Sequence, residues 1–209
     1  MLGDRFRFQT LRDYPDAPNV PEDAATFSGN ATLKAVSLAR WLAARAPLAG
    51  SENEIWVLAD DSGLEVDALG GAPGVYSARY AAVDSAGLGN SPDGENNRKL
   101  LRLLQGIPEG ARTARFRCVI ALTPLLARPS GNASPVCLLD DLELQTQLYE
   151  GTCEGRIGFE TKGVNGFGYD PLFMPDGFPQ TFAELGEKTK NQISHRSKAL
   201  AELVARFPA

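Results

Sequence analysis

The stretch VLADDSGLEVDALGGAPGVYSARY, residues 57–80, joins a short apolar run to two adjacent carboxylates and then to a glycine-rich segment. Its first three residues predict the end of a buried strand, and Ser62 and Gly63 predict a break directly after the acids. In an open α/β sheet, ligands bind in the loops that follow the carboxyl ends of strands. The two acids therefore indicate a candidate functional site.

The two acids, Asp60 and Asp61, are expected to have different roles. Side chains alternate along an extended chain, so neighbouring residues point to opposite faces. One acid should face a ligand while the other supports the fold, and the pattern alone leaves open which is which. The competing interpretation is a solvated strand end or a helix-capping pair.

Hydrophobic periodicity and turn residues divide the rest of the chain into helices and strands. A long helix is predicted at residues 26–46, with Asn30 or Ser28 as its cap. The other predicted elements are a strand at 5–10, a short helix near 77–81, a helix at 97–105, strands at 115–122, 136–139, 142–151 and 154–159, and a final helix at 198–207. The later strands indicate a smaller antiparallel lobe, so residues 1–209 are expected to form a single domain with two lobes.

Composition and charge exclude several functional classes. The 209 residues are 43% hydrophobic, which is enough for one substantial core. The net charge of -5 argues against nucleic acid as a partner, because proteins that bind it usually carry a basic face. A small anionic ligand held by a few local cations remains compatible with this charge.

Three cysteines, Cys118, Cys137 and Cys153, form no CxxC pair, and the chain has a single histidine. Neither a disulfide framework nor a zinc site is indicated, and reduced thiols in the cytoplasm are expected. The first residues lack the apolar core of a signal peptide, and no uncharged apolar run approaches the roughly 20 residues that span a bilayer. We therefore expect a cytoplasmic protein with no membrane partner.

A second candidate segment is GVNGFGYDPLFMP, residues 163–175, in which glycines flank Phe167 and Tyr169 ahead of Asp170. Small neighbours allow a planar ligand to approach an aromatic ring closely. The alternative is a tight turn that binds nothing.

Cations gather in a third segment, KTKNQISHRSKAL, residues 188–200. Lys190, His195 and Arg196 lie just before or at the start of the last helix, where cations and backbone donors suit an anion or a polar heterocycle. A lone histidine beside an arginine is nevertheless more often structural than catalytic.

The first long helix carries a fourth constellation. Asn30 and Lys34 are four residues apart and share one face of it. Taken alone, Lys34 is most simply explained as a solvated helix residue.

Four motifs, TFSGNATLKA (26–35), ADDSGLEVDALGGAPGVYSARYA (59–81), GFGYDPLF (166–173) and ISHRSKAL (193–200), together resemble the inosine triphosphate pyrophosphatase family, also called HAM1-like. They occur in the family's order, and the resemblance runs from about Glu22 to Leu203. It implies an α/β fold with a central mixed twisted sheet, flanking helices and a smaller, partly antiparallel lobe. It also implies a homodimer, with the segment GGAPGVYSARY near its interface.

The activity that the resemblance implies is that of a nucleoside triphosphate pyrophosphohydrolase. Such an enzyme removes non-canonical purine nucleotides (ITP, dITP and XTP) from the nucleotide pool, releasing the monophosphate and pyrophosphate with the help of Mg²⁺. Asp61 is similar to the family's catalytic base and metal ligand, Glu22 to the acid that shares the magnesium, and Lys34 to the lysine that contacts phosphate. The residues that match substrate-binding positions are Ser62, Phe167, Gly168, Tyr169, Asp170, Lys190, His195 and Arg196.

Selectivity has to rest on position 6 of the purine, which is a carbonyl acceptor in hypoxanthine and an amino donor in adenine. Arg196, His195 and backbone N–H groups can donate to a carbonyl and would remain unpaired against an amino group. A buried unpaired donor costs roughly 1 to 3 kcal/mol, so two such contacts would discriminate by about a hundredfold or more.

The chain departs from the family pattern at its start. Members normally open with a strand, a TxNxxK phosphate loop and the following helix start, and no such segment precedes residue 22 here. We expect the true start to lie upstream of Met1. The rival interpretation is a nucleotide-binding, dimer-forming protein with impaired catalysis, and a Maf-like nucleotide pyrophosphatase is a weaker third.

Overall fold

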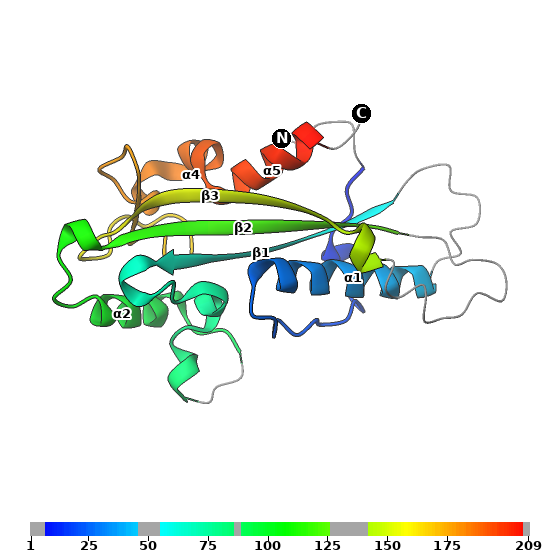
Figure 1. Ribbon diagram of the computed structural model, residues 1–209, viewed down its shortest axis with the longest axis horizontal. Helices are drawn as coiled ribbons and strands as arrows, with labels where there is room; N and C mark the ends of the chain where they lie inside the picture. Colours follow the sequence, from blue (N-terminus) through cyan, green and yellow to red (C-terminus); the bar gives the residue numbers. More distant parts are fainter. Residues whose placement is uncertain (1–6, 46–54, 86–88, 126–141, 207–209) are drawn as a thin grey trace. The chain divides into compact units, whose positions relative to one another are not determined.

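The computed structural model describes residues 7–45, 55–85, 89–125 and 142–206 (Figure 1). Its helices and strands are α1 (Phe27–Arg45), β1 (Trp56–Val66), α2 (Asp93–Leu103), β2 (Thr113–Pro124), β3 (Gln147–Ile157), β4 (Phe173–Pro175), α4 (Phe182–Ile193) and α5 (His195–Arg206). The chain divides into two compact units: residues 1–61, 119–149 and 203–209 form the first, and residues 62–118 and 150–202 the second.

The strands form one sheet in the order β1-β2-β3-β4. Its β3 and β4 pair in antiparallel fashion, with Gly155 opposite Pro175. Ion pairs across β1 and β2 show that these two strands are antiparallel as well. Arg115 lies 2.9 Å from Asp67, just after β1, whereas Arg117, two residues later in β2, lies 3.4 Å from the earlier Glu65. The predicted α/β class with flanking helices is confirmed, and these strand pairs are antiparallel where a mixed sheet was expected.

β1 is longer than its sequence indicates. A break was predicted at Ser62 and Gly63, but the strand runs through them to Val66. Leu64 and Val66 are fully buried in the core of the second unit, and the Leu64 N–H donates to Ser77 Oγ at 2.9 Å. The prediction of a break was wrong because burial of these two side chains outweighs a weak local turn signal.

Other predicted boundaries differ in instructive ways. Residues 7–10 form no strand, and the two strands predicted at 142–151 and 154–159 are one strand, β3, preceded by a helical turn at 142–145. α2 begins four residues before its predicted start. The strand predicted at 136–139 lies outside the described residues.

The long helix predicted at residues 26–46 is confirmed as α1, but the residue that caps its N-terminus is not one of those predicted. Thr26 Oγ1 accepts the Gly29 N–H at 3.0 Å, so Thr26 takes the capping role rather than Asn30 or Ser28. Asn30 is thereby left for a contact described below.

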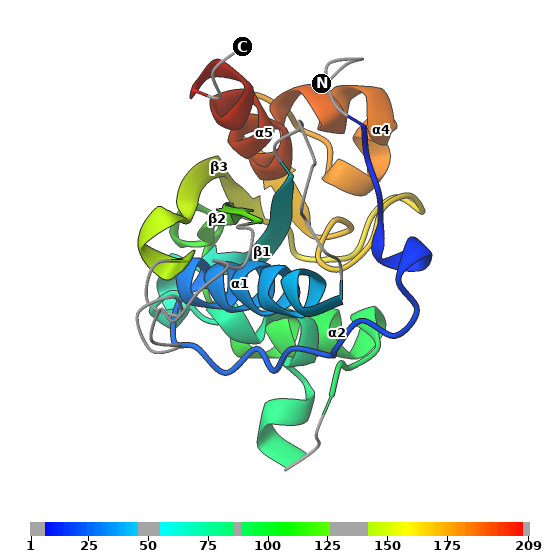
Figure 2. The same ribbon diagram turned by 90° about the vertical axis from the view of Figure 1, so that its right-hand side faces the viewer.

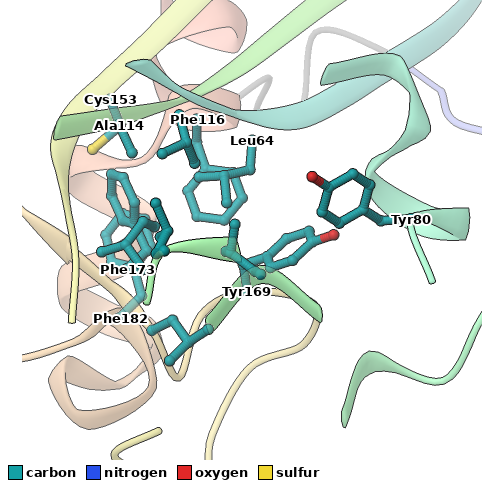
Figure 3. Packing of buried hydrophobic residues seen from close by; sticks show 13 residues of the cluster. Leu64, Tyr80, Ala114, Phe116, Cys153, Tyr169, Phe173 and Phe182 are labelled. Carbon is teal, nitrogen blue, oxygen red and sulfur yellow. The ribbon is translucent and has the colours of Figure 1, made fainter. Parts of the chain in front are cut away.

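The core of the second unit is built around three aromatic rings (Figure 3). Phe116 and Phe173 lie 4.7 Å apart between centroids, and Phe173 and Phe182 lie 5.1 Å apart. These rings come from β2, β4 and α4, so their packing fixes α4 against the strands. Within this unit α2 and α4 lie on opposite sides of the strands (Figures 1 and 2).

Helix α5 approaches β3 closely at a glycine. A Cβ at Gly151 would lie 2.1 Å from His195 O and 2.4 Å from Ala199 N, so no larger residue fits there without backbone movement. Lys198 Nζ donates to Thr152 O at 2.8 Å on the same strand. These contacts fix the first turn of α5, which carries His195 and its neighbour Arg196.

Arg112 joins three backbone segments of the second unit. It is 2% exposed and donates to the carbonyls of Ile157 at 2.9 Å, Leu104 at 2.9 Å and Gly158 at 2.7 Å. We expect Arg112→Met to lower the free energy of unfolding by at least about 2 kcal/mol, because two buried carbonyls and one partly buried carbonyl lose their donors. Urea denaturation measures this change.

Arg156→Met provides the control for that substitution. The Arg156 side chain is 33% exposed and has one long ion pair, 3.6 Å from Glu109. We expect a change within about 0.5 kcal/mol, which is typical of exposed pairs. Equal effects of the two substitutions would contradict the role given to Arg112.

Two further expectations concern the cysteines and the membrane. Cys118 and Cys153 are buried, and Cys137 lies outside the described residues. Burial raises the pKa of the Cys153 thiol to about 11. Over the parts of the chain that the structure describes, no helix combines the length and apolar character needed to cross a membrane.

Candidate active site

The first unit brings together three of the predicted site residues: the predicted catalytic base, a predicted metal ligand and a predicted phosphate contact. Asp61, near the middle of β1, accepts a hydrogen bond from Lys34 Nζ at 3.0 Å through its Oδ1. Lys34 Nζ also lies 3.4 Å from Glu22 Oε1. One ammonium group therefore contacts both carboxylates, and we call Asp61, Lys34 and Glu22 the acid–lysine cluster.

Asn30 connects this cluster to the fold. It is fully buried, donates from Nδ2 to Asp61 Oδ2 at 3.2 Å, and accepts the Ala24 N–H at 2.9 Å. Because Ala24 lies two residues after Glu22, the same amide orients Asp61 and anchors the segment that carries Glu22. The predicted common face of Asn30 and Lys34 on α1 is confirmed.

Burial raises the pKa of the Asp61 carboxyl, since desolvation disfavours its charged form. The hydrogen bond and charge of Lys34 and the hydrogen bond from Asn30 act in the opposite direction, and the charge of Glu22 adds to the rise. A carboxylate with a raised pKa is a stronger proton acceptor than an exposed one. Asp61 is thus suited to take a proton from water.

The cluster also has the donors that a hard divalent cation prefers. Mg²⁺ in nucleotide sites commonly binds one or two carboxylates and completes its coordination with waters and phosphate oxygens. Glu22 and Asp61 match that donor set. Among the described residues, no group of three or more His, Cys, Asp or Glu side chains is arranged to hold a metal.

Asp60 and Ser62, on either side of Asp61, are half-buried. Their side chains point to the opposite face of β1 from Asp61, as the alternation of an extended chain requires. The structure thereby answers the question of which acid joins the polar cluster, which is Asp61. The predicted substrate contact of Ser62 stays a prediction.

The second unit brings together an aromatic ring and cations. The Phe167 ring is 62% exposed, with Lys190 Nζ 4.6 Å and the Arg196 guanidinium 6.0 Å from its centroid. Lys190 also forms an ion pair with the buried carboxylate of Asp170. We call Phe167, Lys190, Arg196 and Asp170 the aromatic–cation cluster.

A tight loop holds this cluster together. Asp170 Oδ2 accepts the Phe167 N–H at 3.0 Å. Gly166 has a φ of +79°, and a Cβ there would lie 2.1 Å from Asp170 Oδ2. Glycine is therefore required twice at this position, once by the backbone conformation and once by the space that the carboxylate occupies.

Two predicted substrate contacts are largely buried. Tyr169 is 3% exposed, belongs to the hydrophobic core and donates its hydroxyl to Ser77 O at 2.9 Å; burial strongly raises its pKa. His195 is 6% exposed, and its ring stacks on Phe116 with a centroid distance of 4.8 Å. Both side chains support the loop and the start of α5, and their direct contact with a ligand stays a prediction.

Sequence reasoning missed two residues of α2 that contact the loop. Asp93 accepts the Gly168 N–H at 2.7 Å, and Asn97 donates to Gly168 O at 3.0 Å. The available signal was Asn97, a polar residue of α2 that is buried and lies four residues after an acid.

Comparison with known proteins gives one family for nearly the whole chain. The model of the Ham1 family matches residues 1–206. A relative from Shouchella clausii (strain KSM-K16), named dITP/XTP pyrophosphatase, is 45% identical over 203 residues, which cover 97% of this chain and 85% of the relative. A relative of the same name from Desulforamulus reducens is 46% identical over 195 residues, covering 93% and 80%.

Solved structures agree with these sequence matches. A HAM1 protein from Coxiella burnetii superposes with a TM-score of 0.73 at 34% identity and covers 98% of this chain and 88% of its own. The Ham1 protein of Staphylococcus aureus gives 0.69 at 37% identity, with 93% and 82% covered. The similarity therefore extends over both units of the chain.

Proposed function

Because this chain belongs to the Ham1 family, we propose that it is a nucleoside triphosphate pyrophosphatase that acts on dITP, XTP and ITP. It converts each triphosphate to the monophosphate and pyrophosphate and so removes non-canonical purines from the nucleotide pool. The observation that carries this proposal is the acid–lysine cluster, in which Asp61 has a raised pKa and Lys34 contacts both carboxylates.

Asp61 acts as the general base. It accepts a proton from water, whose oxygen forms a bond to the α-phosphorus as the bond from that phosphorus to the pyrophosphate oxygen breaks. Lys34 offsets negative charge on the phosphates during this step. Asn30 keeps the Asp61 carboxylate oriented, because its amide is itself fixed by the Ala24 N–H.

Magnesium is the proposed cofactor. Glu22 and Asp61 would hold it, and when bound it would neutralise triphosphate charge and activate water. Lys34 would then contact phosphate oxygens in place of the two carboxylates. Its Nζ lies on a flexible side chain that is 22% exposed, which permits this exchange.

The aromatic–cation cluster is proposed to bind the purine. Phe167 offers a ring for stacking, and Lys190 and Arg196 offer donors that suit the 6-carbonyl of hypoxanthine or xanthine. Asp170 holds Lys190 through their ion pair. Adenine places an amino group where these donors require an acceptor, so it is rejected.

Arg196→Ala is expected to reduce the preference for ITP over ATP by about tenfold, since one donor to the 6-carbonyl is lost. The ratio of the two kcat/KM values measures it. Arg206→Ala, in the last turn of the same helix, is the matched control and should leave the ratio unchanged. Full retention of the ITP preference in Arg196→Ala would count against this assignment.

Oxygen isotope labelling tests the proposed reaction. With dITP as substrate in ¹⁸O-labelled water, attack at the α-phosphorus places the label in the monophosphate. Label in the pyrophosphate, or release of orthophosphate instead of pyrophosphate, would refute the proposed bond cleavage. Binding of dITP with no turnover would favour the rival interpretation of a nucleotide-binding protein with impaired catalysis.

We also propose that the enzyme works in the cytoplasm as a homodimer that includes the segment GGAPGVYSARY in its interface. Tyr76 is 49% exposed and Val83 50% exposed, so apolar surface lies in and just after this segment. Buried reduced thiols are consistent with a reducing compartment. Sedimentation should give a mass near twice the 22.4 kDa of one chain.

A further inference from the structure

Gly168 is held by two side chains that the proposed reaction does not use. Asp93 Oδ2 accepts the Gly168 N–H at 2.7 Å, and Asn97 Nδ2 donates to Gly168 O at 3.0 Å. Both backbone polar groups of this loop residue are thus bonded to α2, which lies more than seventy residues earlier in the chain.

The spacing and chemistry of the two side chains fit this contact. Asp93 and Asn97 are four residues apart and lie on the same face of α2. An ionised carboxylate can only accept, so Asp93 matches the N–H of the glycine, and the amide nitrogen of Asn97 donates to its carbonyl. Gly168 has a φ of +61°, a conformation that its missing Cβ makes accessible.

These bonds orient the residue before the glycine. The Gly168 N–H belongs to the planar peptide unit that it shares with Phe167, so fixing this group fixes the plane to which Phe167 is attached. The Gly168 carbonyl belongs to the peptide unit shared with Tyr169, which is anchored in the core. The exposed ring of Phe167 therefore extends from a backbone that is held on both sides.

Burial of Asn97 favours a directed role over general packing. The residue is 5% exposed, and among the described residues its Oδ1 receives no hydrogen bond. An apolar side chain would fill the same space without burying an amide whose hydrogen bonds are half satisfied. The bond to Gly168 explains why an amide stands there.

We propose that Asp93 and Asn97 are positioning residues that hold Phe167 in the orientation in which it stacks on the purine. This inference rests on the proposed function, in which the Phe167 ring contacts the base. Because the two side chains hold the loop in place before the nucleotide binds, binding does not carry the entropic cost of ordering the loop. The two side chains therefore increase affinity. Neither side chain belongs to the acid–lysine cluster, so the chemical step does not depend on them.

The test separates KM from kcat. We expect Asp93→Ala and Asn97→Ala each to raise the KM for ITP about three- to tenfold, the value of one hydrogen bond, with kcat within about twofold of the wild type. Asp93→Asn retains an oxygen acceptor for the Gly168 N–H and should restore most of the affinity. Asp93 is exposed, so its substitution leaves the core intact.

Asn96→Ala is the matched control. Asn96 is 2% exposed on the same helix, but its side chain bonds the Ala81 N–H at 2.8 Å and the Ala78 carbonyl at 3.3 Å instead of the loop. Its loss should lower the melting temperature without raising KM. An equal rise of KM in Asn96→Ala would overturn the inference, because general loosening of α2 would then explain the effect.

Binding of inosine monophosphate, measured by calorimetry, provides a readout that is independent of hydrolysis. The Asp93→Ala and Asn97→Ala variants should lose the same factor in affinity for this product as in KM. Folded variants with unchanged KM and unchanged affinity would overturn the inference. A wild-type chain that binds inosine monophosphate but releases no pyrophosphate would instead contradict the proposed function, while the effect of the variants on binding would still decide this inference.

Discussion

Replacing Asp61 with asparagine is expected to lower kcat at least a hundredfold while leaving the melting temperature at pH 7 no lower than that of the wild-type chain. Activity falls because the amide cannot accept the proton of the attacking water. Stability is retained because the wild-type carboxylate is ionised in a place where burial disfavours its charge. Steady-state kinetics and metal-free thermal denaturation measure the two effects.

The raised pKa of Asp61 also determines how its contribution to stability changes with pH. The folded-state pKa of Asp61 is raised above the ordinary aspartate value of 3.8, so between that value and the folded pKa the folded state binds more protons than the unfolded state. The contribution of Asp61 to stability is therefore present at low pH and is lost as pH rises through the folded pKa. The stability advantage of Asp61→Asn should appear at neutral pH and vanish near pH 4 and below.

Asp67→Asn is the matched control. Hydrogen bonds from Thr113 and Arg115 lower the pKa of Asp67, so its contribution to stability is present at neutral pH and is lost as pH falls through the folded pKa. This variant should keep kcat and lose stability at pH 7, the reverse of Asp61→Asn. A large loss of kcat in Asp67→Asn, or near wild-type kcat in Asp61→Asn, would contradict the assignment of the base.

Replacing Lys34 with methionine is expected to lower kcat/KM by about a hundredfold, which is typical for loss of one group that stabilises charge in a transition state. Methionine keeps the apolar stem and removes the charge. The same change leaves Asp61 and Glu22 without their shared cation, so stability at pH 7 should fall and the deficit should shrink as pH is lowered. Kinetics at pH 7 and thermal denaturation between pH 4 and 7 test both effects.

Two further variants serve as controls for this prediction. Lys34→Arg retains the charge and should recover part of the activity, though not all, because a planar guanidinium presents its donors differently. Lys162→Met removes a lysine whose side chain is 54% exposed and pairs with Glu160 at 3.3 Å, and it should change neither activity nor stability. Equal losses in Lys34→Met and Lys162→Met would show that overall charge, and not this cluster, is responsible.

The residues of the acid–lysine cluster were predicted through the family resemblance, and local geometry accounts for only part of their arrangement. A spacing of four residues places Asn30 and Lys34 on one face of α1, and the alternation of a strand separates Asp60 from Asp61. Which acid meets Lys34 needed the structure, since that depends on how the strand lies against the helix. The burial that raises the pKa of Asp61 also depends on packing and has no sequence signature.

The residues of the aromatic–cation cluster and its neighbours could be predicted from sequence. Which of their side chains face solvent and which support the loop could not. Phe167 and Tyr169 were both predicted to bind substrate, whereas the structure exposes the first and buries the second in the core. Likewise His195 packs on Phe116, a partner almost eighty residues away. Long-range packing decides which ring of such a segment faces solvent, and a linear pattern cannot express it.

The length of β1 and the contacts of Gly168 escaped prediction for the same reason. Ser62 and Gly63 form a turn signal on local grounds, yet burial of Leu64 keeps the chain extended. Asp93 and Asn97 gain their role only through a residue more than seventy positions later. In both cases tertiary contacts outweigh local preference.

Initial rates of pyrophosphate release test the central claim most directly, measured on the full chain with ITP, XTP, dITP, ATP and a pyrimidine triphosphate, each with and without Mg²⁺. The account predicts Mg²⁺-dependent release with kcat/KM for ITP and XTP at least about a hundredfold above that for ATP, the effect of two unpaired donors against adenine. Equal kcat/KM values for ITP and ATP, or no pyrophosphate from any purine triphosphate, would contradict it.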